Sequence, residues 1–69
     1  MIVKIAPLGE RVVEINVATG TNVAECLRIA GVQLNGRVLT VNDSAATTST
    51  PVQQDGSIIA LISKMKGGA

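Results

Sequence analysis

The sequence predicts a small α+β domain in which four or five strands form a mixed sheet and one helix packs across it. Three observations predict this fold class. Short β-branched segments alternate with turn residues, one stretch of roughly ten residues has helical spacing, and the strongest apolar run comes last. A strand that is apolar along its length favours the middle of a sheet, where neighbours cover both of its edges. We therefore expect the first and last strands to lie side by side, with the helix on one face.

The N-terminal segment predicts an antiparallel hairpin. Residues 1–6 are short and β-branched, as in a strand, and residues 6–10 contain the Pro and Gly of a turn. Residues 11–17 then alternate with period two, which predicts a second strand with one face in the core. The predicted core face consists of Val13, Ile15 and Val17.

One helix of roughly ten residues is predicted next. Asn22 is the expected N-cap, with Glu25 as its capping-box partner, and Thr21 is the competing cap. Gly31 is the expected C-terminal stop. The apolar residues at helical spacing are Val23, Cys26, Leu27 and Ala30. We expect this stripe to lie on the hairpin, since an isolated helix of this length is marginal in water.

The second half predicts further strands joined by turns. Asn35-Gly36 is expected to close a tight turn before a strand over residues 37–41. Residues 42–50 are rich in Asn, Asp, Ser, Ala and Thr, which predicts a surface loop with room for one short edge strand. Pro51 and Val52 are candidates to hold this loop against the body of the domain.

The last strand is the strongest in the sequence. A turn over residues 54–56 precedes it, and residues 57–63 form a nearly continuous apolar run. Most of its large residues are expected in the core, while one alternate pair is a candidate for an exposed apolar patch that binds a partner. The sequence leaves open which pair this is among Ile58, Ile59, Leu61 and Ile62. We expect residues 1–63 to form the domain and residues 64–69 a C-terminal tail.

The composition excludes several classes of protein. The 69 residues are 46% hydrophobic and 16% charged, which is too apolar for a disordered tail and too short for a second domain. A net charge of +1 and the lack of any aromatic residue argue against nucleic-acid binding. Neither a transmembrane segment nor a signal peptide is visible, so we expect no membrane partner and a cytoplasmic protein.

The sequence also argues against an enzyme. It contains no histidine, which removes Ser-His and Cys-His catalysis, and no paired carboxylate suggests acid–base work. Cys26 is the one cysteine, so neither an internal disulfide nor a zinc site with several cysteines is possible. Its place in the helical stripe predicts a buried small hydrophobe rather than a reactive thiol. We expect no cofactor and no metal.

Four features combine over nearly the whole chain. The predicted order is strand, strand, helix, strand, loop, strand; residues 20–27 turn into the helix; and Asn42 follows residues 39–41 of the third strand. Residues 52–61 place an Asp-Gly turn before the last strand, ahead of Gly67-Gly68. In these features the chain resembles the β-grasp, ubiquitin-like proteins. It is most similar to the small prokaryotic sulfur carriers of thiamin and molybdopterin synthesis and to the related small protein modifiers.

The resemblance implies that the glycine carboxylate at the end of the tail reacts. In the family, an ATP-dependent activating enzyme adenylates this carboxylate. Sulfide then converts it to a thiocarboxylate, or a cysteine and then a lysine convert it to an isopeptide bond. Gly67 and Gly68 would thread into the narrow channel of that enzyme, because glycine has no Cβ. Lys64 and Lys66 would meet acidic groups at its rim.

The sequence departs from the family pattern at two positions. Ser57 stands where the family has an acidic residue after the Asp-Gly turn, and Ala69 follows Gly68. We therefore expect Ala69 to be removed by a processing protease before activation, and a modifier would also require acceptor proteins. The alternative is a non-covalent interaction module that is never activated. Its binding surface would be the open sheet face or the edge strand near residues 47–50.

Overall fold

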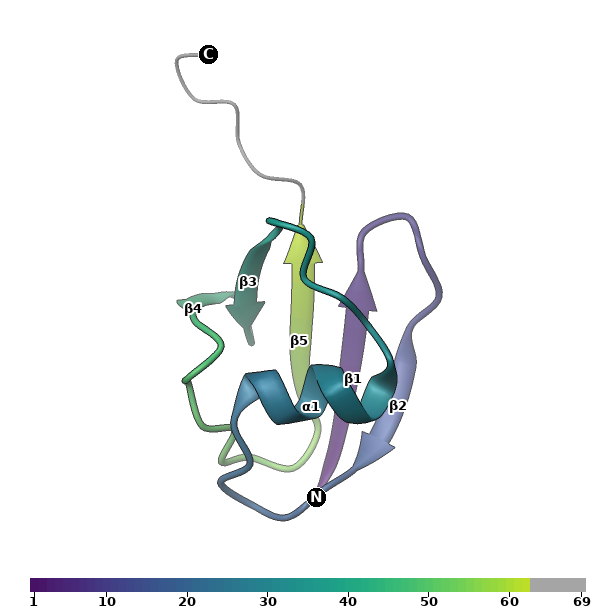
Figure 1. Ribbon diagram of the computed structural model, residues 1–69. Coiled ribbons are helices and arrows are strands. Elements are labelled where there is room, and N and C mark those ends of the chain that lie inside the picture. The colour runs from purple at the N-terminus through teal and green to yellow at the C-terminus, as the bar shows by residue number, and fades with distance from the viewer. Residues whose placement is uncertain (63–69) are drawn as a thin grey trace.

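Within residues 1–62, which the computed structural model describes, five strands form one mixed sheet and one helix crosses a face of it (Figure 1). The expected α+β class is confirmed, with five strands. The elements are β1 (Ile2–Pro7), β2 (Val13–Asn16), α1 (Val23–Ala30), β3 (Val38–Val41), β4 (Ser44–Ala46) and β5 (Ser57–Ile62).

The last strand lies in the middle of the sheet, as predicted. The strand order is β2-β1-β5-β3-β4. β5 runs parallel to β1, with Ile59 opposite Ile5, and antiparallel to β3, with Leu61 opposite Leu39. β2 and β4 form the two edges, each antiparallel to its neighbour. The short edge strand allowed for within residues 42–50 is β4.

Strict alternation along β5 separates the two faces of the sheet. Ile59 and Leu61 are completely buried, whereas Ile58 and Ile62 are exposed. The buried face packs against α1. Of the expected core face of the second strand, Ile15 and Val17 are buried and Val13 is partly buried against the core; Val17 directly follows β2. The core consists of Val3, Ile5, Ile15, Val17, Val23, Cys26, Leu27, Leu39, Val52, Ile59 and Leu61.

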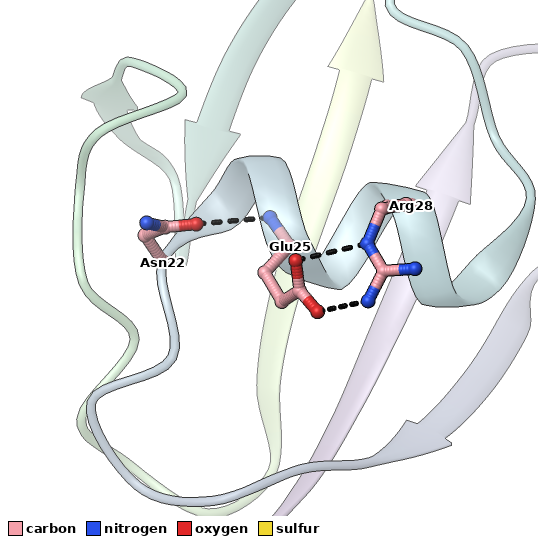
Figure 2. Close-up of polar contacts among 3 residues, drawn as sticks. All are labelled: Asn22, Glu25 and Arg28. Atoms are coloured by element: carbon pink, nitrogen blue, oxygen red, sulfur yellow. Dashed lines mark hydrogen bonds and ion pairs between the residues drawn. The ribbon is translucent and has the colours of Figure 1, made fainter.

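The ends of α1 follow the predicted caps with one correction. At the start of the helix the Asn22 Oδ1 atom accepts the Glu25 N–H at 2.9 Å (Figure 2). Gly31 ends the helix in the left-handed conformation. The Glu25 carboxylate does not return to the Asn22 backbone as a capping box requires. It pairs instead with the guanidinium of Arg28, whose Nε lies 3.0 Å from Oε1, and these hydrogen bonds lower the pKa of Glu25. The i,i+3 partner on the helix surface therefore outcompetes the reciprocal cap.

The loop after β4 is held against the start of the helix. Thr48 and Thr50 accept the first two helical N–H groups, of Ala24 and Val23, through their backbone carbonyls, each at 3.0 Å. Val52 is 1% exposed and exchanges backbone hydrogen bonds with the segment before the helix. The predicted anchoring of this loop is thereby confirmed.

The boundaries of β1 and β2 differ from the prediction. Pro7 was expected in a turn but belongs to β1, opposite Leu61. A proline has no N–H to donate, but no hydrogen bond to β5 is lost here, because the Leu61 carbonyl accepts from Leu8 at 2.8 Å. No hydrogen bond to β2 is lost either, since the pairing of β1 with β2 already ends at Ile5. Residues 11 and 12 lie in the connection before β2, so the second strand is shorter than expected.

Replacing Asn22 by Ala is expected to lower the free energy of unfolding by about 1 kcal/mol, because the Glu25 N–H loses its acceptor. Asn22→Asp retains an acceptor oxygen and serves as the matched control. Thr21→Ala should not remove a helix cap, since the Thr21 hydroxyl donates to the Ala18 carbonyl at 2.6 Å. Urea unfolding measures all three variants; an effect of Thr21→Ala with no effect of Asn22→Ala would reverse this assignment.

Candidate functional site

The predicted reactive residues form the C-terminal tail. Gly67, Gly68 and Ala69, together with Lys64 and Lys66, lie outside the described residues 1–62. The structure therefore describes the surface around the end of β5, where the chain continues into this tail. The same applies to the predicted boundary between domain and tail at residue 63.

Ile62, the last residue of β5, is flanked by two exposed apolar residues from the neighbouring strands. Val38 at the start of β3 pairs with it in register. Leu8 follows β1, and its N–H donates to the Leu61 carbonyl, which places Leu8 beside the end of β5. The exposed fractions are 58% for Leu8, 38% for Val38 and 40% for Ile62. Three apolar side chains from three chain segments thus meet where the sequence continues into the tail.

These residues belong to the face of the sheet opposite α1. Side chains alternate along each strand, so Ile58 and Ile62 share this face while Ile59 and Leu61 face the helix. The alternate pair that the sequence left open is therefore Ile58 and Ile62. We call Leu8, Val38, Ile58 and Ile62 the open-face patch.

The polar surroundings of the open-face patch differ between its two ends. At the start of β5, Lys4 is exposed and lies beside Ile58 in register. At the far end, the Arg37 Nη1 atom lies 3.1 Å from Oε2 of Glu10. Arg37 also donates to the carbonyl oxygens of Gln33 and Leu34. The hairpin loop after β1 and the loop before β3 are thereby tied together next to Leu8 and Val38.

The N-terminus of α1 offers no anion site. A helix begins with four N–H groups that lack helical partners. In α1 the N–H groups of Val23 and Ala24 bond to the loop carbonyls described above, and that of Glu25 bonds to Oδ1 of Asn22. Because the first three N–H groups of the helix are occupied, they are not free to bind a phosphate.

Cys26 lies in the core, as predicted. Its side chain is completely buried on the sheet-facing side of α1. Burial raises the pKa of the Cys26 thiol, and the nearby Glu25 carboxylate raises it further. Since the thiolate is the nucleophile, this cysteine is poorly suited to form a thioester or a disulfide.

Ser57, the position that departs from the family pattern, is a buried structural residue. Its hydroxyl donates to the Gln54 carbonyl at 2.6 Å and lies 3.3 Å from Nδ2 of Asn42. Asn42 in turn accepts the Ile58 N–H at 3.0 Å through its side chain. Asn42, the residue after β3, therefore extends the pairing between β3 and β5 beyond the last strand residue.

Sequence reasoning missed two members of the open-face patch. Leu8 follows Pro7 in a predicted turn, and Val38 alternates with core residues, so neither has a local signal of its own. Only the register of β1 and β3 against β5 brings them beside Ile62. The link between Glu10 and Arg37, which are 27 positions apart, was also not predicted.

Residues 1–62 contain no group of three His, Cys, Asp or Glu side chains able to hold a metal ion. Nor do they contain a helix with the length and apolar character needed to cross a membrane.

The chain matches no protein-family model, no curated protein and no solved structure. A functional proposal therefore rests on the residues of this chain and on the geometry of its sheet.

Cys26 is expected to be inert toward a disulfide reagent such as dithionitrobenzoate while the protein is folded, and to react rapidly in denaturant. The reason is its complete burial and its raised pKa. The absorbance of the released thiolate measures both rates in the same sample. Reaction of the folded protein at the rate of the unfolded chain would contradict a core position for this thiol.

Proposed function

We propose that this chain is a β-grasp, ubiquitin-like carrier or modifier that reacts through a C-terminal diglycine. A protease cleaves the bond between Gly68 and Ala69. An activating enzyme then adenylates the Gly68 carboxylate with ATP, and the product serves as a protein modifier or as a thiocarboxylate sulfur donor. The chain itself is the acyl donor and not the catalyst.

The arrangement of β5 is the observation that carries the proposal. This strand is central, parallel to the first strand, and ends at the open-face patch. The sequence then reaches Gly67-Gly68 after residues 63–66. The strand order β2-β1-β5-β3-β4, with one helix across one face, is the arrangement expected of a β-grasp domain.

The distance between the patch and the diglycine suits a single partner. A chain spans at most about 3.5 Å per residue, so Gly68 cannot lie more than roughly 20 Å from Ile62. One enzyme surface can therefore contact the open-face patch while the tail reaches its active site. Four apolar side chains form a small contact, which favours a partner that binds and then releases the carrier.

The proposed chemistry places every catalytic group on the partner. A carboxylate oxygen of Gly68 attacks the α-phosphorus of ATP, and pyrophosphate leaves, which gives an acyl-adenylate. Sulfide or a cysteine thiolate then displaces AMP. Glycine fits this role because it has no Cβ and reaches conformations closed to other residues.

Deleting Gly67 and Gly68 is expected to abolish every covalent product of this chain. The test expresses the chain with an N-terminal epitope tag in its own cells. Conjugates are detected by immunoblotting and by diglycine remnants in digested proteins, and thiocarboxylate by retarded migration in mercury-containing gels. The wild-type chain should give one of these products, and Ala69→Ser, the matched control that retains the diglycine, should give the same one. Products from the deletion variant, or none from wild type, would refute the proposal.

A non-covalent interaction module is the second candidate. The observation in its favour is that the open-face patch lies wholly within residues 1–62 and needs no tail to exist. An exposed cluster of apolar side chains is typical of a protein interaction surface. In this case Gly67 and Gly68 would have no role in binding.

The double variant Ile58→Thr/Ile62→Thr separates the two candidates when it is compared with the diglycine deletion. Threonine keeps the β-branched shape that suits a strand and removes apolar surface. We expect the double variant to lose the bound partner and its covalent products, with little change in stability. Ile29→Thr, at an exposed position on α1, is the matched control and should lose neither. A partner retained in full by the deletion variant but lost by the double variant would favour the module.

A further inference from the structure

Asn35 differs from the other asparagines within residues 1–62. The side chains of Asn16, Asn22 and Asn42 each accept a hydrogen bond from a main-chain nitrogen atom. None of the hydrogen bonds within this part of the chain involves the side chain of Asn35, which is exposed. No hydrogen bond within residues 1–62 therefore fixes the orientation of its amide.

The residue after Asn35 is equally unhindered. Asn35 and Gly36 are the central residues of a tight turn, with φ of 51° and 72°, closed by the Arg37 N–H donating to the Leu34 carbonyl at 2.9 Å. Apart from the two adjoining residues, no atom of residues 1–62 lies within 4 Å of the position that a Gly36 Cβ would occupy. The Gly36 N–H donates none of the hydrogen bonds within residues 1–62.

We propose that Asn35 is a site of spontaneous covalent modification, in which Gly36 supplies the nucleophile. The Gly36 nitrogen attacks Cγ of Asn35, a new C–N bond forms, and the bond from Cγ to Nδ2 breaks. Ammonia leaves with the proton from the Gly36 nitrogen, and a cyclic succinimide remains. Water then opens the ring at one of its two C–N bonds, which gives aspartate or isoaspartate. Water is the sole co-reactant.

The folded state permits this reaction at Asn35 and opposes it at Asn42. Ring closure requires the turn to open, and an exposed turn spanned by one hydrogen bond opens locally without global unfolding. Asn42 also has a positive φ, of 50°, but its side chain is bonded to Ser57 and Ile58. The residue after it, Asp43, carries a side chain that crowds its nitrogen.

The modification changes the loop that borders the open-face patch. Isoaspartate adds a methylene group to the main chain and a negative charge to the turn that positions Arg37. Arg37 holds Glu10 and the Gln33 carbonyl through its guanidinium. Lengthening the turn therefore disturbs the link between the two loops beside Leu8 and Val38. This inference does not depend on the proposed carrier role.

The test incubates the folded full chain at mildly alkaline pH and maps its peptides by mass spectrometry. Isoaspartate is counted by transfer of a labelled methyl group with an isoaspartyl methyltransferase. We expect the amide-to-acid mass change at Asn35, one ammonia released for each change, and an unmodified Asn42. Asn35→Gln should lose the methyl label on the peptide that contains position 35, since its longer side chain disfavours the ring.

A parallel incubation in urea gives the rate of Asn35 conversion in the unfolded chain. Conversion of Asn35 in urea with none in the folded protein would overturn the proposal, as would equal conversion of Asn35 and Asn42 in the folded state. In the purified isoaspartyl form, NMR should show faster solvent exchange of the Arg37 Nε–H than in Asn35→Gln. Unchanged exchange would contradict the effect on the loop.

Discussion

The parallel pairing of β1 with β5 is the constraint on which the other features depend. Parallel neighbours need a long crossover connection. Because β1 is the first strand and β5 the last, the helix and the other three strands form that connection. The pair also fixes the two faces of the sheet. Val3, Ile5, Ile59 and Leu61 are completely buried on the face that α1 covers. Alternation then leaves Lys4, Ile58 and Ile62 on the opposite face.

The same pairing produces the candidate site. Because β1 and β5 run in one direction, both finish at the same end of the sheet, and the antiparallel β3 starts at that end too (Figure 1). Leu8, Val38 and Ile62 therefore form one apolar surface where the chain continues into the tail. The ion pair between Glu10 and Arg37 connects the two loops that border it. In the proposed mechanism the domain supplies a docking surface for the partner, and the chemistry takes place on the partner.

Local signals in the sequence predicted most of the fold. The Asn22 cap, the Gly31 stop and the continuous apolar run of β5 each act within a few residues, and the structure has all three. The sequence predicted an exposed alternate pair on the last strand and left open which pair it is. It could not predict that Leu8 and Val38 join this pair, because that depends on register across strands that are distant in sequence. Competition between local partners explains the capping-box error, since Glu25 had both the Asn22 backbone and Arg28 within reach. Pro7 was wrongly predicted to lie in a turn. Proline fits in β1 at this position because neither neighbouring strand accepts a hydrogen bond from residue 7, and that depends on strand pairing and not on the local sequence. Activation of the diglycine remains a prediction from the sequence alone.

The most direct test of the central claim is the intact mass of this protein, purified without a tag from its own cells. The proposal predicts a chain that ends at Gly68. A sulfur carrier would show a further exchange of one oxygen for sulfur, and a modifier would appear attached to other proteins through Gly68. A mass that retains Ala69 in every pool, with no conjugates, would contradict activation of the diglycine.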